Sequence, residues 1–185
     1  MTALARRVAT LLGLLAWLAA PAAADQNDPR LDPLFARLKQ VDAVEARSVE
    51  ARIWILWGQS GDPQSQELLE AGSVAMANRD YGAARSSLDA LVERAPGFAE
   101  GWNRRATLFW VQGEYAASVR DIRRTLALEP RHFGALSGLG LIYMTIGESE
   151  AALRSFEAAL EIHPNLPGAR HHADLLRRGL DGAPL

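Results

Sequence analysis

The four histidines are the residues of this sequence best suited to bind a metal ion or to transfer a proton. They are His132, His163, His171 and His172. A metal site would have to combine His163 with the adjacent pair, but neighbouring helical residues point about 100° apart and seldom reach one ion together. We therefore interpret all four as surface histidines, with a metal site as the alternative.

No other side chains have a spacing typical of catalysis. The sequence contains neither a phosphate-binding glycine loop nor an H-E-x-x-H zinc motif. Gly134, Gly138 and Gly140 fall in a helical pattern without a preceding strand and do not form a dinucleotide fingerprint. The absence of cysteine excludes disulfides, thiol catalysis and cysteine-ligated metals. We therefore do not expect an enzyme, and we expect no catalytic residue, no metal and no cofactor.

Arginine supplies almost all of the positive charge. Three arginines share one predicted helix: Arg120, Arg123 and Arg124. They could bind phosphate or an acidic peptide, but we favour a solvated outer face. Arg105 occupies a position that otherwise belongs to the core. It could reach solvent or a ligand, but we expect it to pair with Asp121 or Asp89 on a facing helix.

The composition indicates a folded protein without a nucleic-acid partner. Apolar residues make up 49% and charged residues 23% of the 185 residues, which is ordinary for a globular chain. The formal net charge of −2 provides no strong positive field for nucleic acid.

Residues 1–24 have the pattern of a secretory signal peptide. Arg6 and Arg7 precede an uncharged run of 13 residues, 8–20, and an Ala-x-Ala site stands before Asp25. This run is short for a membrane span, which needs about 20 apolar residues, so we expect no span in the mature chain. A retained anchor and an organellar transit peptide are the alternatives. We therefore expect an exported protein, in the periplasm or secreted.

Prolines mark a repeated unit in the middle of the chain. Pro96, Pro130 and Pro164 follow one another at intervals of 34 residues. Aligned on them, the units are 65–98, 99–132 and 133–166. Each unit contains two stretches with apolar or small residues at helical spacing, separated by turn residues. The pattern predicts three helical hairpins.

The flanking residues complete the predicted domain organisation. Residues 25–61 predict an N-terminal helical hairpin, which we expect to cover the apolar end of the array. Residues 62–180 form the array, and a capping helix is expected at 169–180. Residues 181–185 form a tail.

The three units resemble tetratricopeptide repeats. The family pattern is W-x2-L-G-x2-Y, a turn with Gly and Tyr, then A-x3-F-x2-A and a proline. Unit 133–166 retains most of it, including Leu139, Gly140, Tyr143 and Phe156, whereas Arg105 replaces the leucine in unit 99–132. The resemblance implies an all-α fold. It would be a right-handed α-solenoid of three helix hairpins with an N-terminal hairpin and a C-terminal capping helix.

The resemblance also implies a binding surface, because the first helices of such units line a concave groove. The positions that it places in this groove are Leu69, Ser73, Met76, Asn103, Thr107, Trp110, Ser137, Leu141 and Met144. Met76, Trp110 and Met144 would form a ladder suited to an irregular partner surface. Gly134 and Gly138 would leave room for a partner's backbone. The alternative is that these side chains pack against neighbouring helices or the N-terminal hairpin.

One type of ligand is disfavoured by the residues present. Some members of this family clamp a C-terminal carboxylate with Lys and Asn in the first unit and with Lys and Arg in the third. The matching positions here are Leu69, Ser73, Gly134 and Gly138. We therefore expect no such clamp.

The predicted function is that of an exported protein–protein interaction module. It would act as a scaffold, adaptor or assembly factor that binds a peptide or helix of a partner protein in its groove. A structural subunit of a cell-envelope complex, held by its convex face or N-terminal hairpin, is the alternative. An enzyme that uses Arg105, the histidines and nearby carboxylates is a further alternative.

Overall fold

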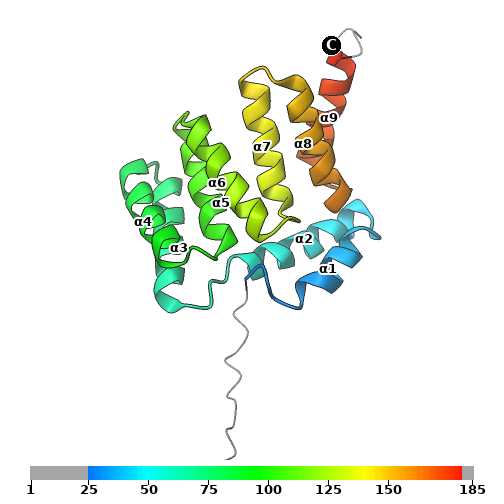
Figure 1. The fold of residues 1–185 in the computed structure, drawn as a ribbon. Coiled ribbons are helices and arrows are strands. Elements are labelled where there is room, and N and C mark those ends of the chain that lie inside the picture. The colour runs from blue at the N-terminus through cyan, green and yellow to red at the C-terminus, as the bar shows by residue number, and fades with distance from the viewer. Residues whose placement is uncertain (1–24, 181–185) are drawn as a thin grey trace, which may run out of the picture.

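A computed structural model describes residues 25–180, and every regular element within them is a helix (Figure 1). In chain order these are α1 (Leu31–Leu38), α2 (Ala43–Trp57), α3 (Pro63–Ala77), α4 (Tyr81–Arg94), α5 (Ala99–Val111), α6 (Tyr115–Leu128), α7 (Phe133–Thr145), α8 (Ser149–Ile162) and α9 (Pro167–Leu180). The predicted signal peptide, 1–24, and tail, 181–185, lie outside the described residues. In the range 25–180, no helix combines the length and hydrophobicity that a membrane crossing requires.

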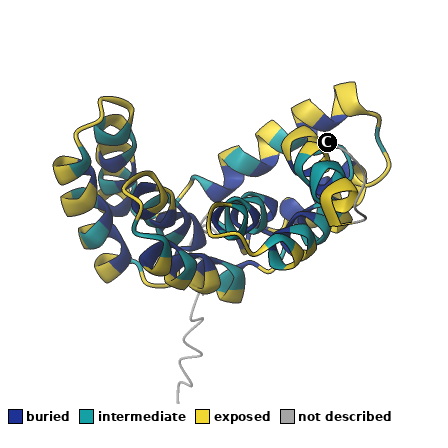
Figure 2. Ribbon diagram, turned by 90° about the horizontal axis from the view of Figure 1, so that it is seen from above, coloured by how far each residue is buried: buried dark blue, intermediate teal, exposed yellow. Residues whose placement is uncertain are grey.

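The helices α3 to α8 form three antiparallel hairpins that stack in chain order, and α9 packs on α8 (Figure 1). This is the all-α solenoid that the sequence predicts. Seen from above, the buried residues follow the interfaces between successive helices, and the exposed residues face outward (Figure 2). Each hairpin thus buries its apolar face against its neighbours, as repeat architectures require.

Capping and turn residues set the limits of the hairpins. Asp62 caps α3 through its side chain, and Pro63 takes the first helical position, where its missing amide hydrogen costs nothing. Gly113 and Gly147 form the turns of the second and third hairpins with φ of 77° and 81°. The first hairpin has Arg79 at φ 60° in the same place, a conformation that non-glycine residues rarely adopt.

Small residues allow the two helices of a hairpin to approach closely. A Cβ atom at Gly140 would lie 2.7 Å from Cζ of Phe156, too close for any side chain. Gly72 has the same role between α3 and α4. In the middle hairpin Ala106 takes this place, and its carbonyl accepts a hydrogen bond of 2.7 Å from Oγ of Ser118.

The N-terminal hairpin, α1 and α2, lies elsewhere than predicted. It crosses the loop edge of the array below α7 and α8 (Figure 1). Its buried side chains share one core with α7, α8 and α9, which includes Phe133 and Phe156. The core of the first hairpin, around Leu88, contains no residue of α1 or α2. The prediction that this hairpin covers the apolar end of the array is therefore wrong, because Trp54 and Trp57 pack on His132 and Phe133 at the start of α7 instead.

Hydrogen bonds join the N-terminal part of the chain to all three loops that precede α5, α7 and α9. The pairs are Gln26–Gly97 at 2.7 Å, Asp32–Arg131 at 2.7 Å and Val41–Asn165 at 2.9 Å. Because successive hairpins meet at these loops, the contacts fix the hairpins relative to one another.

An aromatic cluster forms the centre of this contact. The ring of Trp57 stacks on the buried ring of His132, with centroids 4.1 Å apart and planes 8° apart. Trp54 meets Phe133 edge to face at 5.5 Å. A Cβ atom at Gly134 would lie 2.5 Å from Cη2 of Trp54, so the indole occupies the space that this glycine leaves open.

We expect Gly134→Ala to destabilise the protein by roughly 1–2 kcal/mol, because the added methyl group overlaps Trp54 and outweighs the gain in helix propensity. Gly138→Ala on the same helix is the matched control, since its Cβ would lie 3.8 Å from Ile122 and the change should be neutral or stabilising. Urea unfolding followed by circular dichroism measures both. In a Trp54→Ala background the cost of Gly134→Ala should disappear, and equal effects of the two alanine substitutions would contradict the proposed contact.

Candidate functional site

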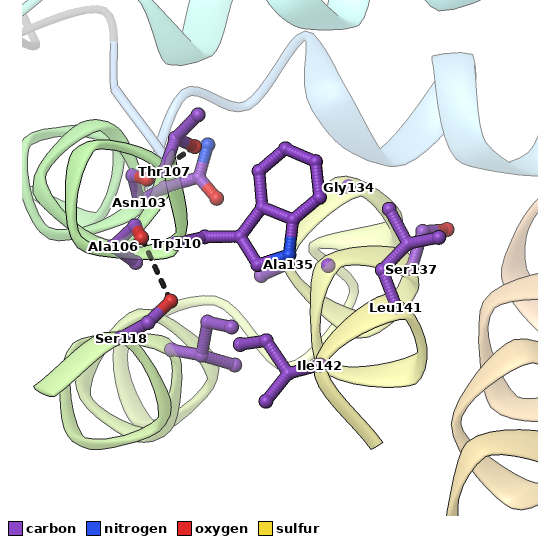
Figure 3. A pocket seen from close by; sticks show the side chains of 12 residues that line it. Asn103, Ala106, Thr107, Trp110, Ser118, Gly134, Ala135, Ser137, Leu141 and Ile142 are labelled. Carbon is purple, nitrogen blue, oxygen red and sulfur yellow. Dashed lines mark hydrogen bonds between the residues drawn. The ribbon is translucent and has the colours of Figure 1, made fainter. Parts of the chain in front are cut away.

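A pocket of about 210 Å³ opens between α5 and α7 (Figure 3). Its lining residues are Asn103, Ala106, Thr107, Trp110, Ser118, Ile122, Gly134, Ala135, Ser137, Gly138, Leu141 and Ile142. The lining is mostly apolar, and the indole of Trp110 reaches from α5 toward α7 (Figure 3). We call this the Trp110 pocket.

Five of the nine predicted groove residues line the Trp110 pocket: Asn103, Thr107, Trp110, Ser137 and Leu141. The side chains of α5 and α7 meet here because the two helices are the first helices of neighbouring hairpins. Trp110 is 39% exposed. A large aromatic side chain that is open to solvent beside an apolar pocket is a common anchor for a binding partner.

The other four predicted residues do not line this pocket. Leu69 is buried in the core of the first hairpin, so its predicted place in the groove is wrong. Its side chain packs on Leu88 and other core residues. Ser73 is half-buried, and its Oγ donates to the carbonyl of Leu69 at 2.7 Å. Met76 and Met144 are half-buried against the cores of the first hairpin and of the C-terminal half. Of the predicted ladder, therefore, Trp110 alone lines the pocket.

A second pocket of about 190 Å³ lies on the other side of α7, between α7 and α9. Its lining residues are Glu50, Trp54, Phe133, Gly134, Ser137, Leu141, Phe156, Leu166, Gly168, Ala169 and His172. It shares Gly134, Ser137 and Leu141 with the Trp110 pocket. We call it the Glu50 pocket, and the two together form a groove across α5, α7 and α9.

The sequence did not indicate Glu50, Trp54 or His172 as groove residues. Glu50 and Trp54 belong to α2, which reaches this surface only because the N-terminal hairpin packs below α7. The space at Gly134, predicted to receive a partner's backbone, is filled by Trp54 of the same chain. Gly138 lines the Trp110 pocket without such a neighbour.

A buried carboxylate joins α5 to the junction before α7. Glu100 accepts hydrogen bonds from Asn103 at 2.9 Å and from Arg104 at 2.6 Å, and Nε2 of His132 lies 3.1 Å from its Oε2. Nδ1 of His132 accepts from the amide of Ala135 at 3.1 Å and caps α7. Burial alone would raise the pKa of Glu100, but the hydrogen bond with His132 and the charge of Arg104 outweigh it and lower the pKa.

A second histidine–carboxylate pair joins α2 to the end of α8. Nε2 of His163 lies 3.2 Å from Oε2 of Glu50, and Nε1 of Trp54 donates to the other oxygen at 3.2 Å. The hydrogen bond with His163 lowers the pKa of Glu50, against the opposing effect of burial. The carboxylate is therefore ionised at neutral pH.

Two of the four histidines are not at the surface, where the sequence predicts them. His132 and His163 are buried, because each closes a junction between hairpins through a carboxylate. His171 is exposed and His172 is half-buried. No group of histidines and carboxylates in the range 25–180 is arranged to hold a metal ion.

Arg105 pairs as the sequence predicts. Its guanidinium donates to both oxygens of Asp121, at 2.7 Å and 3.1 Å, and to Asp89 at 2.8 Å. It therefore joins α4, α5 and α6. Arg120 and Arg123 are exposed on α6 and line neither groove pocket.

Comparison with known proteins identifies the repeats. The profile of the family described as Tetratricopeptide repeat matches residues 69–119 and 103–167. A TPR repeat-containing protein of Rhizobium etli is 38% identical over 154 residues, which are 83% of this chain and 76% of the relative. Some relatives are longer. The small glutamine-rich tetratricopeptide repeat-containing protein 2 of Saccharomyces cerevisiae is 28% identical over 99 residues. These residues are 54% of this chain but only 29% of that relative.

Solved structures share the fold. The Sgt2 TPR domain from Aspergillus fumigatus superposes with a TM-score of 0.61 at 21% identity, over 65% of this chain and 81% of that domain. The first TPR of Spaghetti (RPAP3), bound to the Hsp90 peptide SRMEEVD, gives a TM-score of 0.61 at 20% identity, over 64% of this chain and 94% of that one.

We expect the free energy of unfolding to decrease as the pH falls below about 4.3, the ordinary pKa of a glutamate. The pKa values of Glu50 and Glu100 are lowered in the folded state, so their contribution is complete above that pH and is lost as the pH falls toward the folded-state values. Urea unfolding at a series of pH values measures this decrease. Glu100→Gln should flatten it, whereas Glu67→Gln, at an exposed glutamate of α3, is the control. An unchanged pH dependence in Glu100→Gln would contradict the role of the buried carboxylate.

Proposed function

The chain belongs to the tetratricopeptide repeat family, and we propose that it is an exported interaction module that holds a segment of another protein in the groove across α5, α7 and α9. The observation that carries this proposal is the Trp110 pocket, where an open aromatic side chain stands beside an apolar hollow. The matching profile is that of a repeat family and not of a catalytic one. It therefore supports an interaction module over an enzyme.

The division of the groove into two hollows favours a peptide or helix. Each pocket by itself, at about 210 Å³ or 190 Å³, is smaller than the range of about 300–1,000 Å³ typical of small-molecule sites. They lie side by side and share the ridge formed by Ser137 and Leu141. Two adjacent side chains of one extended segment or helix would fill them.

Peptide binding has a precedent among the similar structures, but the ligand would differ. The Spaghetti domain holds an acidic peptide from Hsp90. The clamp positions expected for such a tail are Leu69, Ser73, Gly134 and Gly138 here, and none of them is a cation. We therefore propose a partner that is not a chaperone tail.

The location of the protein is part of the proposal. Arg6, Arg7 and the apolar run 8–20 support export through a signal peptide, and the periplasm is the compartment we favour. Such a protein would act as a scaffold, adaptor or assembly factor of the cell envelope.

A second function, as a subunit of a cell-envelope complex, is favoured by one observation. Val44 and Ile55 on α2 are 71% and 60% exposed. Both lie on the N-terminal hairpin, away from the two pockets. A partner that covers this hairpin would leave the groove free.

We expect Trp110→Ala to weaken capture of the partner roughly 30-fold or more, because a desolvated tryptophan anchor contributes about 2 kcal/mol or more. The full chain, tagged at its C-terminus and expressed in its source cell, is used for affinity capture and mass spectrometry. Trp102→Ala is the matched control, since this half-buried indole is on the same helix but lies beside Arg105 and Arg124, outside both pockets. Circular dichroism checks folding. Unfolding of Trp110→Ala would identify Trp110 as a core residue, and equal capture by both variants would contradict a groove partner.

We expect the protein recovered from its source cell to begin at Asp25 and to be found in the periplasmic fraction. Intact-mass measurement of the tagged chain after fractionation tests both statements. A cytoplasmic chain that retains residues 1–24 would contradict export.

A further inference from the structure

The Glu50 pocket differs from the Trp110 pocket in charge. Residues of both pockets are mostly apolar, but Glu50 is the one carboxylate among the lining residues of either. Its side chain is 25% exposed. A carboxylate half-buried among apolar groups is costly unless a cation or several donors compensate it.

No arginine or lysine of the described residues pairs with Glu50. Within residues 25–180 its partners are Nε1 of Trp54 and Nε2 of His163, and no Arg or Lys of that range lies within ion-pair distance. Nδ1 of His163 is buried without a hydrogen-bond partner among these residues. Glu50 therefore has two hydrogen-bonding neighbours but no arginine or lysine partner, and because its pKa is lowered it carries a negative charge at neutral pH.

Two further polar atoms of the lining residues have unused hydrogen-bonding capacity. Oγ of Ser137 and Nδ1 of His172 are buried and have no partner among the described residues. Burial, and secondarily the charge of the adjacent His171, lower the pKa of His172, so His172 adds no positive charge at neutral pH. The lining of the pocket thus combines apolar walls with one carboxylate that has no arginine or lysine partner among the described residues.

We propose that the Glu50 pocket binds a lysine or arginine side chain of the segment held in the groove. The aliphatic stem of that side chain would pack on Trp54 and Leu141, and its charged head would donate hydrogen bonds to Glu50. Both parts of such a side chain match the pocket. Lys and Arg have an apolar stem, which suits the apolar walls, and a charged head with several donors and no acceptor, which suits the carboxylate. This inference rests on the proposed function of the groove.

The proposal also defines the order of side chains on the partner. The Trp110 pocket contains no charged lining residue, so it would take an apolar side chain. The two pockets meet at Ser137 and Leu141. A basic side chain would therefore stand close to an apolar one on the bound segment, and an acidic side chain at the basic position would be repelled by Glu50.

Selection from a phage-displayed library of random dodecapeptides tests the proposal on the immobilised full chain. Peptides that bind the natural protein should be enriched in Lys or Arg near an apolar residue. Glu50→Gln preserves the shape of the side chain and removes its charge, so it should lose the basic enrichment and retain the apolar one. Glu45→Gln, at an exposed carboxylate of the same helix that pairs with Arg37, is the matched control and should keep both.

A second measurement uses the natural protein alone and does not depend on the folding of a variant. Replacing the selected Lys or Arg by norleucine preserves most of the stem, and binding should weaken roughly five- to tenfold by fluorescence polarisation.

Five results would overturn the inference, and they fall into three groups that can be told apart. Equal basic enrichment with Glu50→Gln, or no loss on norleucine replacement, would show that Glu50 does not select the residue. Enrichment of acidic peptides would show the opposite chemistry. If no peptide is selected, or if Trp110→Ala selects the same peptides as the natural protein, the groove itself is not the binding site and the proposed function fails as well.

Discussion

The stack of Trp57 on His132 is the contact on which the arrangement of the site depends. It holds α2 against the junction between the second and third hairpins, where both rings are buried and 4.1 Å apart. With α2 in this place, Trp54 covers Gly134 and Glu50 reaches His163. The groove is therefore built from the repeats and from a helix that is not part of them. Its charged residue comes from that helix.

The repeats could be predicted because their packing is local. Proline at intervals of 34 residues and small residues such as Gly140 reflect contacts between helices adjacent in sequence, and each unit repeats the same contacts. Arg105 could be assigned to Asp121 and Asp89 for the same reason, since both lie 16 residues away. The α-helical class and the order of the hairpins follow from such short-range patterns.

The position of α1 and α2 could not be predicted, because nothing local determines it. Their apolar stripes do not show which surface of the array they cover, and in the structure Trp54 and Trp57 pack on His132 and Phe133 at the start of α7. Two wrong predictions follow from the unpredicted position of these helices. His132 and His163 were expected at the surface although the hairpin buries them, and Gly134 was expected to be open although Trp54 covers it. The misplacement of Leu69 has another cause, since family position alone does not show which side of α3 faces the core.

The N-terminal hairpin is made early in synthesis, but the surface that it covers is made late. Glu50 and His163 are 113 residues apart, and Val41 and Asn165 are 124 residues apart. The repeats can fold as each pair of helices becomes available, whereas α1 and α2 must wait for α7, α8 and α9. During that interval Trp57 can meet Phe35 of α1, but the ring of His132 on which it stacks is not yet available. The docking of α1 and α2 on α7, α8 and α9 is therefore the late event of folding. The Glu50 side of the groove forms only at this step.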